Sequence, residues 1–193
     1  MQLFHDWKNP PKSYCVHLLL RSHSAFRPAT GNALSGQLSE AAVLGRSAIE
    51  YAAYGFYLSR KPALLATWSD RARSEIDRKA AKKAFRMAKI MGEIQGVDLE
   101  LFSAFQQLYE SLIDEGAHPN EPAVRTSRVE EEYDSYIMHG QIYLHGSPEL
   151  IRPSLEPITY CGICALDLSG FVFEERFTET GVAAHLADLR QSI

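Results

Sequence analysis

Proline spacing is the feature that most constrains this chain of 193 residues, because proline cannot continue a regular helix. The nine prolines leave two long stretches without proline, at 33–60 and 63–118. Alanine, leucine, glutamate and arginine dominate the first stretch, which predicts one long helix that ends before Pro62. Upstream, the Pro-Ala-Thr-Gly-Asn segment at 28–32 predicts a turn after a first apolar segment at 14–26.

Residues 98–115 have a clear helical period. Their apolar side chains recur every three or four residues and so follow one face of a helix: Leu101, Phe105, Leu108 and Leu112. Asp98 is a typical N-cap, because its carboxylate can accept a bond from an amide of the first turn. Gly116 is a typical stop, so we predict a helix between these two positions.

The segment 121–147 has a different character. A run of three glutamates, at 130–132, leads into an aromatic and β-branched segment at 133–144. This composition favours strands rather than a helix. Within it, His139-Gly140 marks the expected turn of a short hairpin.

Helical composition returns after this segment, at 158–173 and at 178–190. We therefore predict an all-α fold, a helical bundle with a short irregular or β-hairpin insertion around residues 130–146. The length fits a single domain. That domain, 1–193, is expected to comprise an N-terminal extension at 1–13, the insertion at 121–147, and C-terminal helices at 148–193 that pack on the bundle.

The composition is that of an ordinary globular protein, with 46% hydrophobic and 23% charged residues. A net charge of −4 excludes a wholly basic nucleic-acid-binding protein but allows a local basic face. Residues 1–13 lack the apolar core of a secretory signal, and no uncharged run reaches the ~20 apolar residues of a membrane helix. Three cysteines suggest no disulfide framework. We expect a cytoplasmic protein that makes no membrane contact.

Two charged residues stand out on an otherwise apolar helix at 39–58. Arg46 and Glu50 are four residues apart and share a face, which Tyr54 and Tyr57 continue. A buried charge is costly unless it is paired. One interpretation is therefore a structural ion pair. The other is a ligand pocket lined by the tyrosines, with Glu50 as acid, base or ligand and Arg46 as the residue that holds an anion.

His118 is a third candidate catalytic residue, because histidine is the side chain best suited to proton transfer near neutral pH. With Glu115 it spells Glu-x-x-His, one arm of the di-iron sites found in some helical bundles. Gly116 is expected to end the helix between the two residues, and the chain has no second such motif, so we predict no metal site. The alternative for His118 is a loop position near the negative end of a helix.

Cys161-Gly-Ile-Cys164 is a single CxxC motif. Structural zinc requires a second pair of ligands, and a thioredoxin-like site requires a βαβ context. Neither is predicted for this chain. The expected arrangement is two small thiols packed inside a helix, with redox chemistry as the alternative.

Residues 78–89 hold six of the 20 lysines and arginines of the chain and no acidic residue. Helical spacing aligns Arg78, Lys82, Arg86 and Lys89. With Lys83, these residues form a predicted face suited to a nucleic acid or an acidic partner. A face that is merely solvated is the alternative.

Several enzyme motifs are missing from the sequence. It has neither a GxxxxGK[ST] nor a GxGxxG loop for phosphates, and neither a Gly-x-Ser-x-Gly elbow nor a His-Glu-x-x-His. These absences remove support for NTPases, Rossmann oxidoreductases, serine hydrolases and zincins, and we expect no cofactor.

With Arg46-Ser-Ala-Ile-Glu50-Tyr-Ala-Ala-Tyr54 on one helix and Asp114-Glu-Gly-Ala-His118-Pro-Asn120 closing another, the chain resembles bacterial helical proteins of the HEPN-like kind (higher eukaryotes and prokaryotes nucleotide-binding). The likeness spans residues 39–120. Active HEPN ribonucleases have an Arg upstream of a His, and the corresponding positions before His118 are Ser111, Leu112 and Ile113. The resemblance implies a helical bundle that is often dimeric and is sometimes linked to defence against foreign nucleic acid.

The sequence therefore favours a non-catalytic module that binds a ligand or a protein and that forms a homo-oligomer or joins a protein partner. The alternative is a nucleic-acid-linked enzyme of the HEPN-like kind, a ribonuclease or a defence-related protein. That enzyme would use Glu50, His118 and Arg46 in a polar pocket and would contact nucleic acid through the basic helix.

Overall fold

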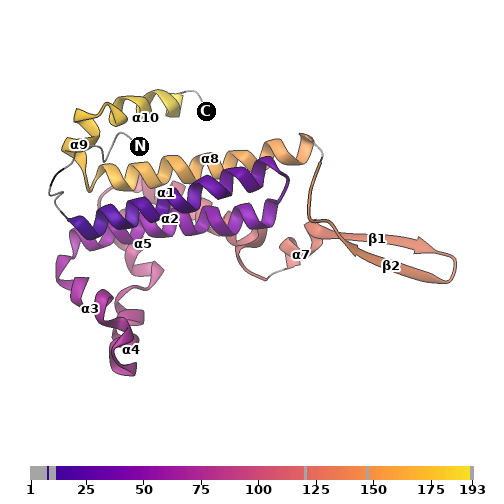
Figure 1. The fold of residues 1–193 in the computed structure, drawn as a ribbon, viewed down its shortest axis with the longest axis horizontal. Helices are drawn as coiled ribbons and strands as arrows, with labels where there is room; N and C mark the ends of the chain where they lie inside the picture. Colours follow the sequence, from indigo (N-terminus) through magenta and orange to yellow (C-terminus); the bar gives the residue numbers. More distant parts are fainter. Residues whose placement is uncertain (1–7, 9–11, 120, 147, 192–193) are drawn as a thin grey trace.

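The structure, a computed structural model, describes residues 8, 12–119, 121–146 and 148–191. Long helices lie side by side in the body of the molecule (Figure 1), and α2 contacts each of the others. They are α1 (Ser13–Leu34), α2 (Leu38–Arg60), α6 (Leu99–Leu112) and α8 (Pro148–Gly170). This arrangement confirms the predicted all-α bundle with a short hairpin insertion.

Shorter elements connect and flank these helices. Between α2 and α6 lie the single turns Pro62–Leu64 and Asp70–Ala72, and the helices α3 (Leu65–Ser69), α4 (Glu75–Ala84) and α5 (Met87–Gln95). A π-helical turn (Ile113–Ala117), α7 (Glu121–Ser127) and the strands β1 (Arg128–Tyr133) and β2 (Tyr136–Gln141) separate α6 from α8. Two short helices follow α8, namely α9 (Glu174–Glu179) and α10 (Val182–Gln191).

Helix α2 is the central element of the core. Its small residues let α1 and α8 approach closely, and Ala48, Ile49, Ala53 and Phe56 are each at most 1% exposed. A helix that is apolar on nearly all sides is stable only where neighbours cover all of those sides. Burial of each large side chain contributes roughly 1.5–3 kcal/mol, so this helix carries much of the stability of the bundle.

The predicted turn at 28–32 is wrong, because α1 continues through Pro28 to Leu34. An internal proline costs a helix about 3 kcal/mol. Here Ala29 and Ala33 are completely buried, and this packing offsets the lost backbone bond. The break lies instead at Gly36, with a φ of +77° and the backbone of His145 so close that a Cβ would lie 2.1 Å from its carbonyl oxygen. Only glycine fits both conditions.

The predicted helix after Asp98 is confirmed. The Asp98 carboxylate accepts a bond of 2.9 Å from the amide of Leu101, and the apolar stripe from Leu101 to Leu112 is buried. Beyond α6 the chain forms the π-helical turn, in which Gly116 has a φ of +142°. A Cβ on Gly116 would lie 2.7 Å from the Cβ of Ser39, so this glycine lets the turn rest on the start of α2.

The hairpin forms with a different turn from the predicted one. It turns at Asp134-Ser135, not at His139-Gly140, because Tyr133 pairs with Tyr136 and their rings stack at 4.8 Å. Aspartate and serine suit a tight turn through side-chain bonds to the backbone. Gly140 lies within β2, opposite Val129.

The C-terminal helices begin earlier than predicted. Helix α8 starts at Pro148, the first helical position, where the missing amide hydrogen costs nothing. It then includes Pro153 and Pro157, which the predicted start at 158 excluded. The predicted helix at 178–190 is divided at Gly181, which has a φ of +73°. The N-terminal extension predicted at 1–13 falls almost entirely outside the described residues.

Candidate functional site

Arg46, Glu50 and Tyr109 form a closed cluster between α2 and α6. The Arg46 Nε donates to the Glu50 carboxylate at 2.9 Å, and its Nη2 donates to the Tyr109 hydroxyl at 2.7 Å. That hydroxyl donates to the same Glu50 oxygen at 3.1 Å. The Arg46 guanidinium also lies over the Tyr109 ring, 4.7 Å from its centre.

This cluster satisfies its own charges. The Arg46 and Glu50 side chains are 21% and 33% exposed, so each keeps only a limited contact with water. Burial raises the pKa of the Tyr109 hydroxyl, and the nearby Glu50 carboxylate raises it further. Tyr109 therefore stays protonated at neutral pH and serves as a hydrogen-bond donor. This geometry is that of a structural ion pair. Tyr109 is its third member, and nothing in the sequence indicates that Tyr109 joins the pair.

The two predicted pocket tyrosines hold the junction between α4 and α5. The Tyr54 hydroxyl donates to the carbonyl of Phe85 at 3.2 Å, and the Tyr57 hydroxyl donates to the carbonyl of Ala84 at 3.4 Å. The Tyr54 ring also stacks on Phe85. Tyr54 and Glu50 line a small hollow of about 240 Å³, whereas Tyr57 is 6% exposed and lies outside that lining. The predicted tyrosine-lined pocket thus forms only in part.

His118 lies apart from Arg46 and Glu50. It follows the π-helical turn in an extended conformation and is exposed, and the turn rests on Ser39. Glu50 is eleven residues further along α2, about 16 Å at the rise of an α-helix. The structure therefore does not bring the three predicted catalytic residues together. Because Gly116 leaves helical geometry, Glu115 and His118 also do not share a helical face.

Cys161 and Cys164 are buried inside α8 as unpaired thiols. Burial raises the pKa of Cys161 to about 12 and that of Cys164 well above its ordinary value. A thiol must ionise to act as a nucleophile or a metal ligand. These two residues therefore act as small apolar side chains at neutral pH, as the core interpretation expects.

The basic segment does not form one continuous helix. Helix α4 ends at Ala84, and α5 begins at Met87, so Arg86 lies in the break with an extended backbone. The predicted alignment of Arg78, Lys82, Arg86 and Lys89 on one helix is wrong, because the chain breaks where Phe85 turns inward between two tyrosines of α2. The side chains nevertheless lie close in the chain and are all exposed: Arg78, Lys79, Lys82, Lys83, Arg86 and Lys89. We call residues 75–89 the basic lobe.

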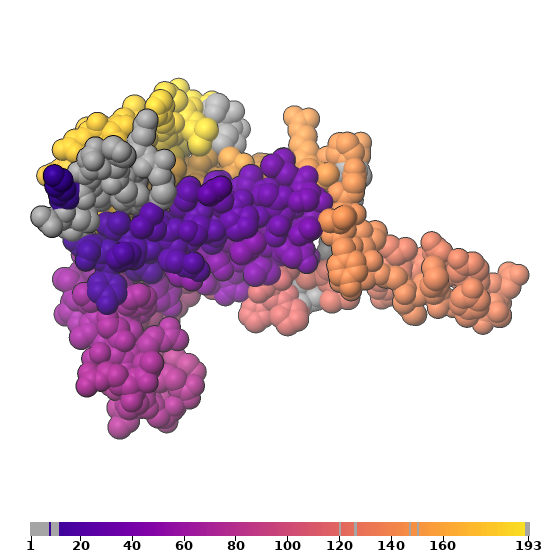
Figure 2. Space-filling view, in the orientation of Figure 1, coloured from indigo at the N-terminus to yellow at the C-terminus, as the bar shows by residue number. Residues whose placement is uncertain are grey.

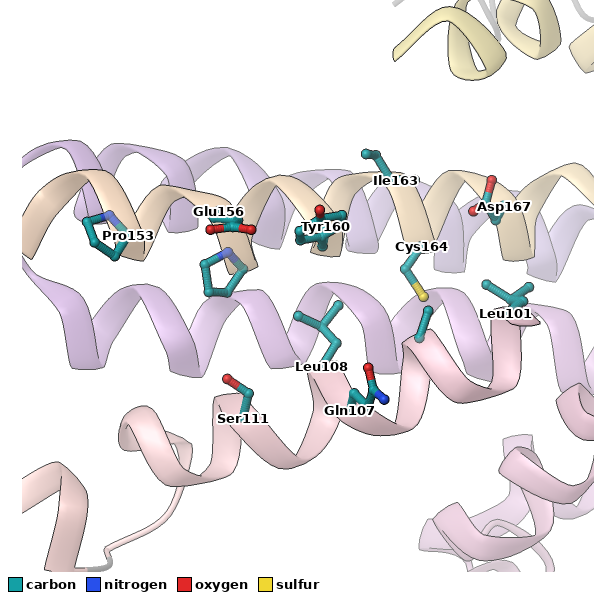
Figure 3. Close-up of a pocket in the computed structure, with 12 residues that line it drawn as sticks. Leu101, Gln107, Leu108, Ser111, Pro153, Glu156, Tyr160, Ile163, Cys164 and Asp167 are labelled. Atoms are coloured by element: carbon teal, nitrogen blue, oxygen red, sulfur yellow. The ribbon is translucent and has the colours of Figure 1, made fainter. Parts of the chain in front are cut away.

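A groove that the sequence did not reveal runs between α6 and α8 (Figure 3). It has a volume of about 460 Å³, within the range of pockets that hold small organic ligands. Its floor is apolar and consists of Leu101, Leu108, Ile163 and Cys164, each less than 10% exposed. The rings of Pro153 and Pro157 form the end of the groove toward the start of α8.

Two carboxylates are among the polar groups around this groove. Glu156 and Tyr160 are exposed at its rim, and Asp167 lies at the far end. Burial raises the pKa of the Asp167 carboxyl, and the guanidinium of Arg190 opposes this by donating a hydrogen bond to it. A second hollow, between α8 and the two last helices, shares Asp167 and Leu101 with the groove. The two hollows therefore meet beside a carboxylate that already binds a guanidinium.

Sequence reasoning could have found one part of the groove. The stripe on α6 contains Leu101 and Leu108, and two prolines spaced by four residues signal an exposed or irregular helix start. No sequence signal indicates that α6 and α8 diverge enough to leave a groove between them, because that spacing depends on how both helices pack on α2.

Neither a scan of protein-family models nor searches of curated proteins and of solved structures gave a match to this chain. Among the described residues, no helix is long and apolar enough to cross a membrane. The same residues include no group of three or more histidine, cysteine or carboxylate side chains placed to hold a metal ion.

Proposed function

We propose that this protein is a non-catalytic binding module whose groove between α6 and α8 takes a small organic cation with an apolar body. The observation that supports this most directly is the composition of the groove, an apolar floor of about 460 Å³ with carboxylates at its rim and at its far end. The apolar body would cover Leu108 and Cys164. An ammonium or guanidinium group would lie beside Glu156.

The charge preference follows from the acceptors. Glu156 carries a negative charge at the rim, and Asp167 at the other end already accepts a bond from the guanidinium of Arg190. An anionic ligand of the same shape would meet these carboxylates without a compensating cation in the groove lining. Like charges repel each other, so we expect the groove to favour a cation over an anion of the same shape.

A matched pair of ligands tests this proposal. Octylamine and octanoate have the same apolar chain and opposite charges, and isothermal titration calorimetry measures each affinity. We expect octylamine to bind at least tenfold more tightly. Filling the groove with Ala104→Phe, at an exposed position of its lining, should abolish that binding, and Glu156→Gln should weaken it several-fold. Glu110→Gln, on α6 outside the groove, is the control and should have no effect.

Two results would overturn the proposal. Equal affinities for the amine and the carboxylate would show that the carboxylates do not select the ligand. Unchanged amine binding in Ala104→Phe, with a helical circular dichroism spectrum, would place the ligand elsewhere. The alternative of a HEPN-like enzyme requires His118 beside Glu50, and RNA cleavage lost in His118→Ala without a lower melting temperature would favour that alternative instead.

A further inference from the structure

The hairpin β1–β2 projects from one end of the bundle as an arm (Figures 1 and 2). Every residue from 128 to 141 is exposed except Val129, which is half-buried. An isolated two-stranded hairpin is marginally stable in water. The arm therefore gains little from folding beside its own bundle, and its side chains are available to another molecule.

The arm combines apolar side chains with negative charge. Tyr133, Tyr136 and Met138 share one face of the hairpin and are 45–59% exposed, and Ile137 on the other face is 52% exposed. Three glutamates and one aspartate of the arm outnumber its single basic residue, Arg128. Glu130 already pairs with Arg128 and His139, which leaves Glu131 and Glu132 as the excess charge.

The basic lobe has the complementary character. Its two acidic residues lie in the first turn of α4, where Glu75 pairs with Arg78 and Asp77 bonds to the Ser74 cap. The lysines at 79, 82 and 83 are exposed beyond that turn. Ile76 is 80% exposed, so the lobe also presents an apolar side chain beside its cations.

The arm and the basic lobe lie at opposite ends of the molecule (Figure 1). They therefore cannot meet within one copy of the chain, but they can meet between two copies. Two antiparallel copies related by a two-fold axis place each arm at the end where the other copy has its lobe. Both contacts then form at once, which closes the assembly as a dimer.

We propose that the β1–β2 arm of one copy binds the basic lobe of a second copy. Glu131 lies on the same face of the arm as the two tyrosines and Met138. It faces the exposed lysines of the lobe of the second copy, and the apolar side chains of that face cover Ile76. A second copy explains both surfaces together. A nucleic acid on the lobe would leave the acidic arm uncovered.

The size of the two surfaces suits such a dimer. Three apolar side chains share that face of the arm, each about half exposed, and they offer about 300 Å² if a large side chain presents ~200 Å². With an equal area on the lobe and two contacts per dimer, the buried surface is about 1,200 Å². Stable protein interfaces bury about 1,200–2,000 Å².

Charge exchange tests the proposal by analytical ultracentrifugation at low salt. The arm variant carries Glu131→Lys and Glu132→Lys, and the lobe variant carries Lys79→Glu, Lys82→Glu and Lys83→Glu. We expect the wild-type chain to be a dimer. The dimer dissociation constant of each variant should be at least tenfold higher than that of the wild-type chain. The chain that carries both sets should dimerise again. The control Glu100→Lys with Glu110→Lys changes exposed charges on α6 and should remain a dimer.

Three outcomes would overturn the proposal. A monomeric wild-type chain at micromolar concentration excludes the dimer, and binding of an RNA oligonucleotide by that monomer through the lobe lysines would assign the lobe to nucleic acid. If the arm variant is monomeric and the lobe variant is still a dimer, the arm binds a surface other than the lobe. Failure of the combined variant to dimerise, while circular dichroism shows intact helices, would exclude direct pairing of these charges.

Discussion

The bundle and its two projections use the same kinds of side chain in opposite ways. In the bundle, Phe56 and Phe105 are at most 1% exposed. In the arm, Tyr133 and Tyr136 are 45% and 59% exposed. Burial explains the aromatic residues of the bundle, because it contributes the free energy that holds the helices together. It does not explain those of the arm, so their presence points to contact with another molecule.

Charged residues show the same contrast. Within the bundle, Arg46 and Glu50 bind each other and Tyr109, so their charges are satisfied by the fold. In the basic lobe, Lys79, Lys82 and Lys83 extend into solvent. Arg46 and Glu50, two of the three candidate catalytic residues, are therefore held by each other and by Tyr109, whereas the predicted binding lysines remain exposed.

The largest expected difference between the two regions is in the stability lost when one aromatic side chain of each is replaced by alanine. Phe105→Ala empties a completely buried site and should lower the free energy of unfolding by about 3–5 kcal/mol. Tyr136→Ala in the arm should change it by less than ~0.5 kcal/mol, because the ring packs mainly on Tyr133. Urea denaturation measures both values.

Both substitutions are best made in the charge-reversed arm variant, which is expected to be monomeric, so that dimerisation does not add to the measured stability. Similar losses for the two substitutions would mean that the arm is part of the cooperative core. The contrast between bundle and arm would then fail.

A smaller effect is expected in the Arg46 cluster. Tyr109→Phe removes one hydroxyl that bonds both partners and should cost about 0.5–1.5 kcal/mol. Glu50→Gln should cost at least as much, because it removes the charge that Arg46 pairs with. Chemical denaturation measures both, and Ser103→Ala, an exposed position on α6, is the control. If neither substitution changes stability, the cluster is not a structural one and Glu50 regains its place as a site residue.

The smallest effect concerns Asp167, whose pKa is raised by burial although Arg190 opposes the shift. The folded state keeps the proton of this carboxyl longer than the unfolded state does, so its contribution to stability is largest in acid and falls as the pH rises through the raised pKa. An asparagine side chain does not titrate, so Asp167→Asn avoids that loss. The melting temperature of the variant minus that of the wild-type chain should therefore increase from pH 4 to pH 7.

Differential scanning calorimetry at several pH values measures the melting temperature of both chains. The titration of other groups cancels in the difference between the two melting temperatures. A difference that stays constant with pH would show that Arg190 fully compensates the burial of Asp167.

Local rules predicted the elements that depend on short stretches of chain. The cap at Asp98, the stripe from Leu101 to Leu112 and the stop at Gly116 all involve neighbours within a few residues. The hairpin was also foreseen from its composition, but its turn was misplaced. The turn position depends on which tyrosines pair across the strands, and that pairing is decided by the whole register.

The errors share one physical cause. Pro28, Pro153 and Pro157 all lie inside helices, against the local preference of proline. Tertiary burial of residues such as Ala29 and Ile158 outweighs that preference, and burial of this kind is not visible in a local pattern. The break in the basic helix has the same origin, because Phe85 packs between two tyrosines of α2.

The amino-acid sequence by itself determined the helical class, the hairpin insertion and the four-residue spacing of Arg46 and Glu50. Only the tertiary structure decided that Tyr109 completes their pairing, that His118 follows a turn resting on Ser39, eleven residues from Glu50 along α2, and that a groove opens between α6 and α8. Periodicity is a property of one helix, whereas a groove, a cluster or an exposed arm depends on the distances between elements. Those distances are set by how α1, α6 and α8 pack on α2.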